Sequence, residues 1–164
     1  APGFYKKKGF IFGPSRIVDS RHSRLYRVLQ LDCERKVYPA DPGLIRAFAA
    51  GPRANLGHAI ETAVCNELER RKADLAYVKT AAGFEVDFHA RFRSGEEELV
   101  QVCADPASPD TLAREVRALR EAGATMPDAC KRLLVMTREQ ANAIQVDGVV
   151  VEPAYAWMLG GGSG

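Results

Sequence analysis

Two carboxylates lie at places where they could hold a metal ion. Glu61 belongs to the stretch NLGHAIETAVCNELERR, and Asp87 belongs to GFEVDFHARF. Mg²⁺ takes oxygen ligands and keeps several waters, so a pair of acids on neighbouring elements is enough to seat it for phosphodiester hydrolysis. Glu61 and Asp87 are therefore the predicted ligands of Mg²⁺, provided that the fold brings a helix and a strand together.

The strand that must position Asp87 alternates apolar and polar residues. This period of two predicts a half-buried strand with Phe84, Val86, Phe88, Ala90 and Phe92 on one face and Glu85, Asp87, His89 and Arg91 on the other. Acids are depleted from strand interiors, so Asp87 indicates a function. Glu85 is instead expected to be a surface residue that pairs with Lys79 or Arg91.

The helix that must position Glu61 is the clearest in the sequence. Asn55 is its expected cap, and one buried stripe is formed by Leu56, Ile60, Val64 and Leu68. Glu61 falls at the edge of this stripe. Glu67 falls within it and needs a partner if it is buried, with Arg70 and Arg71 as the candidates.

The remaining sequence predicts an α/β fold. Two further strands, LAYVKT and ELVQVC, flank the Asp87 strand along the chain, and ELVQVC places Gln101 and Cys103 on a common face. SPDTLAREVRALREAG predicts a helix that is capped by Ser108 and ends at Gly123, and KRLLVMT predicts a buried strand. From Asn55 the order is helix, three strands, helix, strand, which fits a sheet with helices on both faces.

Less regular stretches lie at both ends of this region. KVYPADPGLIRAFAAG predicts a short strand, a turn at residues 41–43 and a helical stretch up to Ala50. AIQVDGVVVEP predicts a strand or a small hairpin around Asp147 and Gly148, and AYAWML predicts a last helical turn. The tail GGGSG, residues 160–164, has the composition of a flexible linker.

Composition limits the class of protein. With 164 residues and 46% hydrophobic content, one domain with its own core is expected. The cysteines form no C-x-x-C pair, which indicates a reducing, cytoplasmic setting and argues against a zinc site built on His89 and Cys103. No apolar run approaches the roughly 18 residues of a membrane span, so no membrane partner is expected.

Charge is uneven along the chain. Residues 1–36 hold nine basic and three acidic side chains, a net charge of +6, so the remainder carries −4 of the total +2. A basic arm of this kind can bind phosphate backbones or an acidic partner, or it can be a solvated segment. The candidate nucleic-acid contacts are Lys6, Lys7, Lys8, Arg21 and Arg24. Residues 1–36 are interpreted as an arm or an incomplete subdomain.

The order of these elements resembles the PD-(D/E)XK (restriction-endonuclease-like) nuclease fold. More closely, NLGHAIETAVCNELERR, GFEVDF and LVQVCAD, preceded by KVYPADPGL, are similar to a C-terminal domain of unknown function that follows the ATPase module in many prokaryotic AAA-type ATPases. The similarity runs from Lys36 to Leu159 and implies a nuclease-like domain over residues 37–159. The sequence contains no G-x-x-x-x-G-K-[ST] motif, so the ATPase module is not part of it.

The resemblance assigns a role to four residues. It implies that Glu61 is the acid of the first helix, that Asp87 is the metal ligand of the second strand, and that Gln101 and Cys103 stand where the third strand carries an acid and a lysine. Gln101 offers no charge, and Cys103 offers no amine to orient water. Loss of a positioned acid or base typically reduces the rate by about 10²- to 10⁴-fold. A relocated Lys79 amine is the alternative source of that group.

Three functions are therefore consistent with the sequence. The first is a nuclease-fold accessory domain of an ATPase whose hydrolytic site has degraded and which binds nucleic acid or a protein partner, such as the ATPase module. The second is an active Mg²⁺-dependent DNA endonuclease. The third is a protein-interaction domain whose acids are structural.

Overall fold

The computed structural model describes residues 5–7, 10–16, 26–31, 34–39 and 56–160, with side chains for Tyr38 and for residues 56–160. The predicted turn at residues 41–43, the helical stretch up to Ala50 and the Asn55 cap lie outside these residues. Among the residues described, no helix is both long and apolar enough to cross a membrane.

The described residues form four helices and nine strands. In chain order they are β1 (Tyr5–Lys7), β2 (Phe10–Arg16), β3 (Tyr26–Leu31), β4 (Glu34–Pro39), α2 (Leu56–Arg70), β5 (Asp74–Lys79), β6 (Glu85–Arg91), β7 (Glu97–Val102), α3 (Pro109–Thr125), β8 (Cys130–Val135), α4 (Arg138–Ala143), β9 (Val150–Pro153) and α5 (Ala154–Leu159). The predicted order from α2 to β8 is confirmed.

The strands form one mixed sheet in the order β4-β3-β2-β5-β6-β7-β8-β9, with β1 paired to β2. The pairs β5–β6 and β6–β7 are antiparallel, and the pairs β7–β8 and β8–β9 are parallel. Strand β2 pairs with β5 and so joins the N-terminal strands to the sheet. The predicted boundary at residue 36 falls within β4, and the division into arm, domain and tail stays a prediction.

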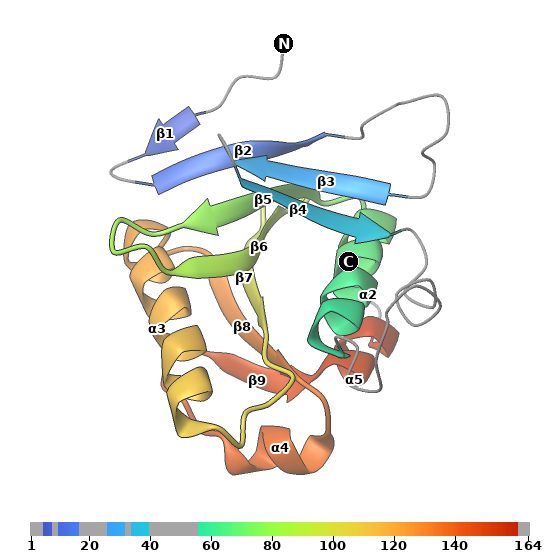
Figure 1. The fold of residues 1–164 in the computed structure, drawn as a ribbon, viewed down its shortest axis with the longest axis vertical. Coiled ribbons are helices and arrows are strands. Elements are labelled where there is room, and N and C mark those ends of the chain that lie inside the picture. Colours follow the sequence, from blue (N-terminus) through green and yellow to red (C-terminus); the bar gives the residue numbers. More distant parts are fainter. Residues whose placement is uncertain (1–4, 8–9, 17–25, 32–33, 40–55, 161–164) are drawn as a thin grey trace.

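Helices cover both faces of the sheet, as the α/β pattern predicts (Figure 1). One buried cluster joins α3 to residues of β5 to β8, and the other joins α2 and α5 to the opposite face. The fold therefore brings the first half of α2, the middle strands and the first half of α3 into range of one another from opposite sides of the sheet.

Strand β6 does not alternate strictly. Its register against β5 shifts between the pairs Ala76 with His89 and Val78 with Val86, so that one extra residue lies on β6. An extra residue moves the side chains that follow it to the other face. Val86 consequently packs on the α3 side and Phe88 on the α2 side. The prediction of one continuous apolar face, residues 84 to 92, was wrong because of this β-bulge.

Helix α3 begins as predicted but does not end at Gly123. Ser108 is its N-cap and accepts a hydrogen bond from Thr111 N, while the helix continues to Thr125. Gly123 is buried inside the helix, where an added Cβ would stand 2.6 Å from Lys131 Cδ. This glycine therefore serves the close approach of α3 to β8 and not the end of the helix.

The C-terminal part contains one helix that the sequence did not predict. A short helix, α4, begins after the N-cap Thr137, whose side chain forms a capping box with Gln140. Of the two alternatives predicted for AIQVDGVVVEP, the strand is confirmed as β9 and the hairpin is not formed, because β9 pairs with β8 in parallel. The last helical turn predicted for AYAWML is confirmed as α5. Gly148 instead has a positive φ of 71°, which a turn residue can adopt without strain when it is glycine.

Helix α2 buries Val64 and Leu68 as the predicted stripe requires, whereas Leu56 at its start is 57% exposed. Glu67 has the expected partners: its carboxylate accepts hydrogen bonds from Arg70 Nε and Arg71 Nε, each at 2.7 Å. These pairs hold the last turn of the helix.

Candidate functional site

A cavity of about 480 Å³ lies between α2, β6, β7 and the first half of α3. Three of the four residues proposed for the site, Glu61, Asp87 and Gln101, line it. Two residues of α3 that the sequence interpretation missed, Arg114 and Glu115, also line it. The helix and the two strands therefore do aim polar groups at a common space, which is the condition for any shared chemistry.

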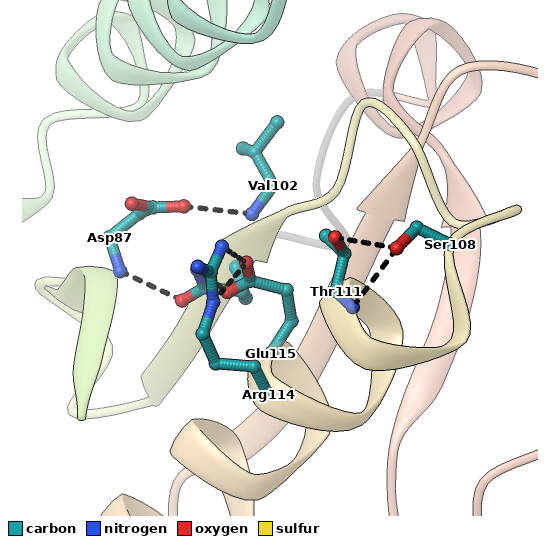
Figure 2. Close-up of polar contacts among 7 residues, drawn as sticks. Asp87, Val102, Ser108, Thr111, Arg114 and Glu115 are labelled. Carbon is teal, nitrogen blue, oxygen red and sulfur yellow. Dashed lines mark hydrogen bonds and ion pairs between the residues drawn. The ribbon is translucent and has the colours of Figure 1, made fainter.

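Asp87 sits where β6 and β7 stop pairing through their backbones. The ladder between these strands runs up to the pair of Phe88 with Val100. Beyond it, Asp87 Oδ2 accepts a hydrogen bond from Val102 N at 3.0 Å, and Asp87 N donates to Gln101 Oε1 at 3.0 Å (Figure 2). Two side chains thus replace the missing backbone bonds, and the strands separate enough to open the cavity.

Gln101 links this strand pair to α3. Its Nε2 donates to Glu115 Oε2 at 2.6 Å, while Arg114 Nη2 donates to Glu115 Oε1 at 2.7 Å (Figure 2). Both Glu115 oxygens are thereby occupied. The Glu115 carboxylate beside Arg114 raises the pKa of the guanidinium above its usual value.

A helical-period signal could have identified Glu115. The apolar line of α3 includes Leu112 and Leu119, and Glu115 lies three residues after the first and four before the second. It therefore belongs to the inward stripe, and it is buried. An acid on the buried stripe of a helix needs a polar partner, which Gln101 supplies.

Glu61 is held from the α2 side by Tyr38 of β4. The Tyr38 hydroxyl donates to Glu61 Oε2 at 3.5 Å, and its ring stacks on His58 with centroids 5.7 Å apart. Burial, followed by the charges of Asp87 and Glu61, raises the pKa of Tyr38 far above its ordinary value. The hydroxyl therefore stays protonated and acts as a donor toward the acids, a role that the sequence did not indicate.

Cys103 does not line the cavity. It is 2% exposed and belongs to the core on the α3 side. Burial, and next the nearby Glu115 carboxylate, raise the pKa of its thiol to about 11. A thiol that is neutral at physiological pH can replace neither the charge nor the proton transfer of a lysine amine.

The neighbouring polar residues have local partners. Glu85 lies 3.5 Å from Lys79 Nζ, which is one of the two expected pairings, whereas Arg91 pairs with Glu97. His89 Nε2 lies 2.9 Å from a Glu97 oxygen. Lys79 therefore sits beside Glu85, where β5 ends and β6 begins.

Hydrogen bonds engage the oxygens that could have joined Glu61 and Asp87 as ligands of a Mg²⁺ ion. Glu115 receives hydrogen bonds on both oxygens, and the Gln101 oxygen receives the Asp87 backbone N–H. Within the described part of the chain, no group of three acidic, histidine or cysteine side chains could hold a metal ion. Glu61 and Asp87 share the cavity, so a Mg²⁺ ion there would rest on these two acids without help from Gln101 or Glu115.

Only two of the five basic residues proposed to contact nucleic acid are among the described residues. Lys6 and Lys7 lie in β1, for which the backbone alone is described, and Lys8, Arg21 and Arg24 lie outside the described residues. Their role stays a prediction.

Comparisons of the chain with protein-family models, characterised proteins and solved structures find no match.

Proposed function

We propose that this chain is a nuclease-fold accessory domain, of the type found in AAA-type ATPases, that binds nucleic acid without hydrolysing it. The order of helix, three strands, helix and strand from α2 to β8 supports the nuclease-like fold. The meeting of Glu61, Asp87 and position 101 at one cavity supports a common origin with a nuclease site.

The hydrogen bonds of Gln101 are the observation that carries the loss of hydrolysis. Its amide bridges Asp87 N and Glu115 Oε2, at 3.0 and 2.6 Å. An amide in this position neutralises no metal charge. Its hydrogen bond to Glu115 also keeps that carboxylate from binding a metal ion. At position 103 a buried thiol gives no general base, because its pKa of about 11 keeps it protonated.

A cleavage assay tests the absence of hydrolysis. Plasmid, linear and branched DNA are incubated with the protein and Mg²⁺ or Mn²⁺, and no cleavage above the protein-free control is expected. Asp87→Asn retains an oxygen that can accept from Val102 N, so it should fold. Glu85 lines the cavity too, so the matched control is Glu96→Gln, an exposed acid in the turn between β6 and β7 that does not line it. Cleavage by the unaltered chain that Asp87→Asn abolishes and Glu96→Gln does not would overturn the proposal.

A second candidate function, an active Mg²⁺-dependent endonuclease, is favoured by one observation. Helix α3 delivers an acid and a cation, Glu115 and Arg114, to the cavity where β7 lacks both. For hydrolysis, the Gln101 to Glu115 hydrogen bond would have to open and release Glu115 toward Asp87. Activity that disappears in both Asp87→Asn and Glu115→Gln would identify this function, since each variant replaces a carboxylate by an amide of similar size.

A further inference from the structure

Three arginines lie along the outward face of α3. Arg114, Arg117 and Arg120 are exposed and follow one another at intervals of three residues, which places each beside the next on the neighbouring turn, rotated by about 60° around the helix axis. At about 1.5 Å of rise per residue the three positions cover about 9 Å of the helix axis. We call these three residues the arginine row.

The carboxylates that accompany the row lie beneath it. Arg114 pairs with Glu115 at 2.7 Å, with the two side chains 66% and 10% exposed. Arg117 pairs with Glu121 at 2.9 Å, with 64% and 29% exposed. In each pair the cation faces outward and the acid faces the protein. Each guanidinium has five N–H donors, so donors remain on the outer side after these bonds are made.

The pairs also fix the direction of the guanidinium groups. Arg117 lies over the ring of Phe84, with its Cζ 4.5 Å from the ring centroid, in addition to its bond with Glu121. A side chain held at two points loses less conformational freedom when a third partner binds. For Arg120 the described residues provide no ion pair, which leaves its charge available at the surface.

The row begins at the mouth of the candidate site. Arg114 lines the cavity itself, and so does Phe84, on which Arg117 stacks. The acids of the cavity, among them Glu61 and Asp87, would repel an anion that entered it. An anionic chain is therefore favoured at the rim, along α3, and disfavoured in the interior.

We infer that the arginine row binds the phosphate backbone of a nucleic acid and guides it past the mouth of the cavity. The inference rests on the proposed function and names the surface that carries out the binding. Evenly spaced cations suit a polymer that bears one charge on every nucleotide, and the planar fork of arginine matches phosphate oxygens. An acidic protein would offer carboxylates at irregular positions and is the competing partner in the test.

The test measures how DNA affinity depends on salt. Fluorescence anisotropy with a labelled single strand and a labelled duplex gives Kd between about 50 and 200 mM KCl. Removing two phosphate contacts in the double variant Arg117→Gln and Arg120→Gln should reduce the slope of log K against log salt by about 1.4 for the single strand and about 1.8 for the duplex. The variant with lysine at both positions keeps the charge and should retain the slope.

A matched control removes the same charge elsewhere. Lys72 follows α2 and Arg93 lies in the turn between β6 and β7, and both are exposed. The control carries glutamine at both positions and should keep the slope of the unaltered chain. Circular dichroism and urea unfolding verify that all variants fold.

Each outcome has a distinct meaning. If the unaltered chain binds DNA but the row variant and the control have equal slopes, the row is refuted while nucleic-acid binding stands. If the unaltered chain does not bind DNA at about 50 mM KCl, both the row and the nucleic-acid part of the proposed function fail. If polyglutamate competes as well as DNA at equal charge, an acidic protein partner replaces the inference.

Discussion

Exchanging Gln101 for glutamate, the acid that the family resemblance leads one to expect, should destabilise this protein in a pH-dependent manner. In Gln101→Glu the new carboxyl group replaces an amide whose nitrogen lies 2.6 Å from Glu115 Oε2. Two unit charges about 3 Å apart repel by about 5 kcal/mol at an effective dielectric constant of 20. This repulsion exceeds the cost of protonating one carboxyl group at neutral pH, so the variant should take up a proton when it folds.

The protonation cost limits the expected loss of stability. From a reference pKa near 4.3, holding a carboxyl group protonated at pH 7 costs about 4 kcal/mol, and at about pH 5 it costs about 1 kcal/mol. The acid pair of the folded variant has a raised pKa relative to the unfolded chain. Its destabilising effect is therefore full above the folded-state pKa and shrinks as the pH falls toward the unfolded value.

Urea unfolding at both pH values measures this effect through the fluorescence of Trp157, the single tryptophan, which is buried. Gln101→Leu is the control that adds no charge: it leaves the Asp87 N–H and Glu115 Oε2 without Gln101, should cost about 1 to 3 kcal/mol for each group, and should change less between the two pH values than Gln101→Glu. Combining Gln101→Glu with Glu115→Gln exchanges the acid and the amide and should recover most of the stability at pH 7. A Gln101→Glu variant as stable as the unaltered chain at pH 7, or equally weakened at both pH values, would refute the reasoning.

Other consequences of the structure can be checked by simple measurements. Ser108→Ala removes the N-cap of α3 and should cost about 1 kcal/mol, or about 2 to 4 °C in a calorimetric Tm, whereas Ser108→Asp should keep it. Gly123→Ala should fail to give the gain of about 1 kcal/mol usual for alanine in a helix, because Lys131 must move, and the gain should appear when Lys131→Ala is added. In the native protein iodoacetamide at about pH 8 should label the exposed Cys130 and spare Cys103, which is buried and whose pKa is about 11. In urea both cysteines should be labelled. Labelling of Cys103 in the native protein would contradict its burial.

The sequence determined the elements that have a strong local signal. The stripe through Val64 and Leu68 identified α2, and the cap at Ser108 identified the start of α3. Runs of β-branched and aromatic residues identified the middle strands. Such features depend on neighbours within one or two turns, so a single chain displays them without knowledge of the fold.

Local patterns failed where a distant contact overrode them. Gly123 is of the residue type that commonly ends a helix, yet it lies inside α3, where Lys131 of β8 packs against it. The alternation of β6 predicted one apolar face, yet the bulge opposite β5 divides Val86 from Phe88. Neither outcome is encoded in the flanking residues alone.

The candidate site was also determined partly by the sequence and partly by the tertiary structure. Residue types and order in the sequence pointed to Glu61, Asp87 and position 101, and the fold does bring them to one cavity. Only the tertiary structure revealed Glu115, Arg114 and Tyr38 as their partners, because α3 and β4 come from distant parts of the chain to bond with the residues of the site. Hydrogen bonds and charges act through space, so the partners of a buried acid are set by packing.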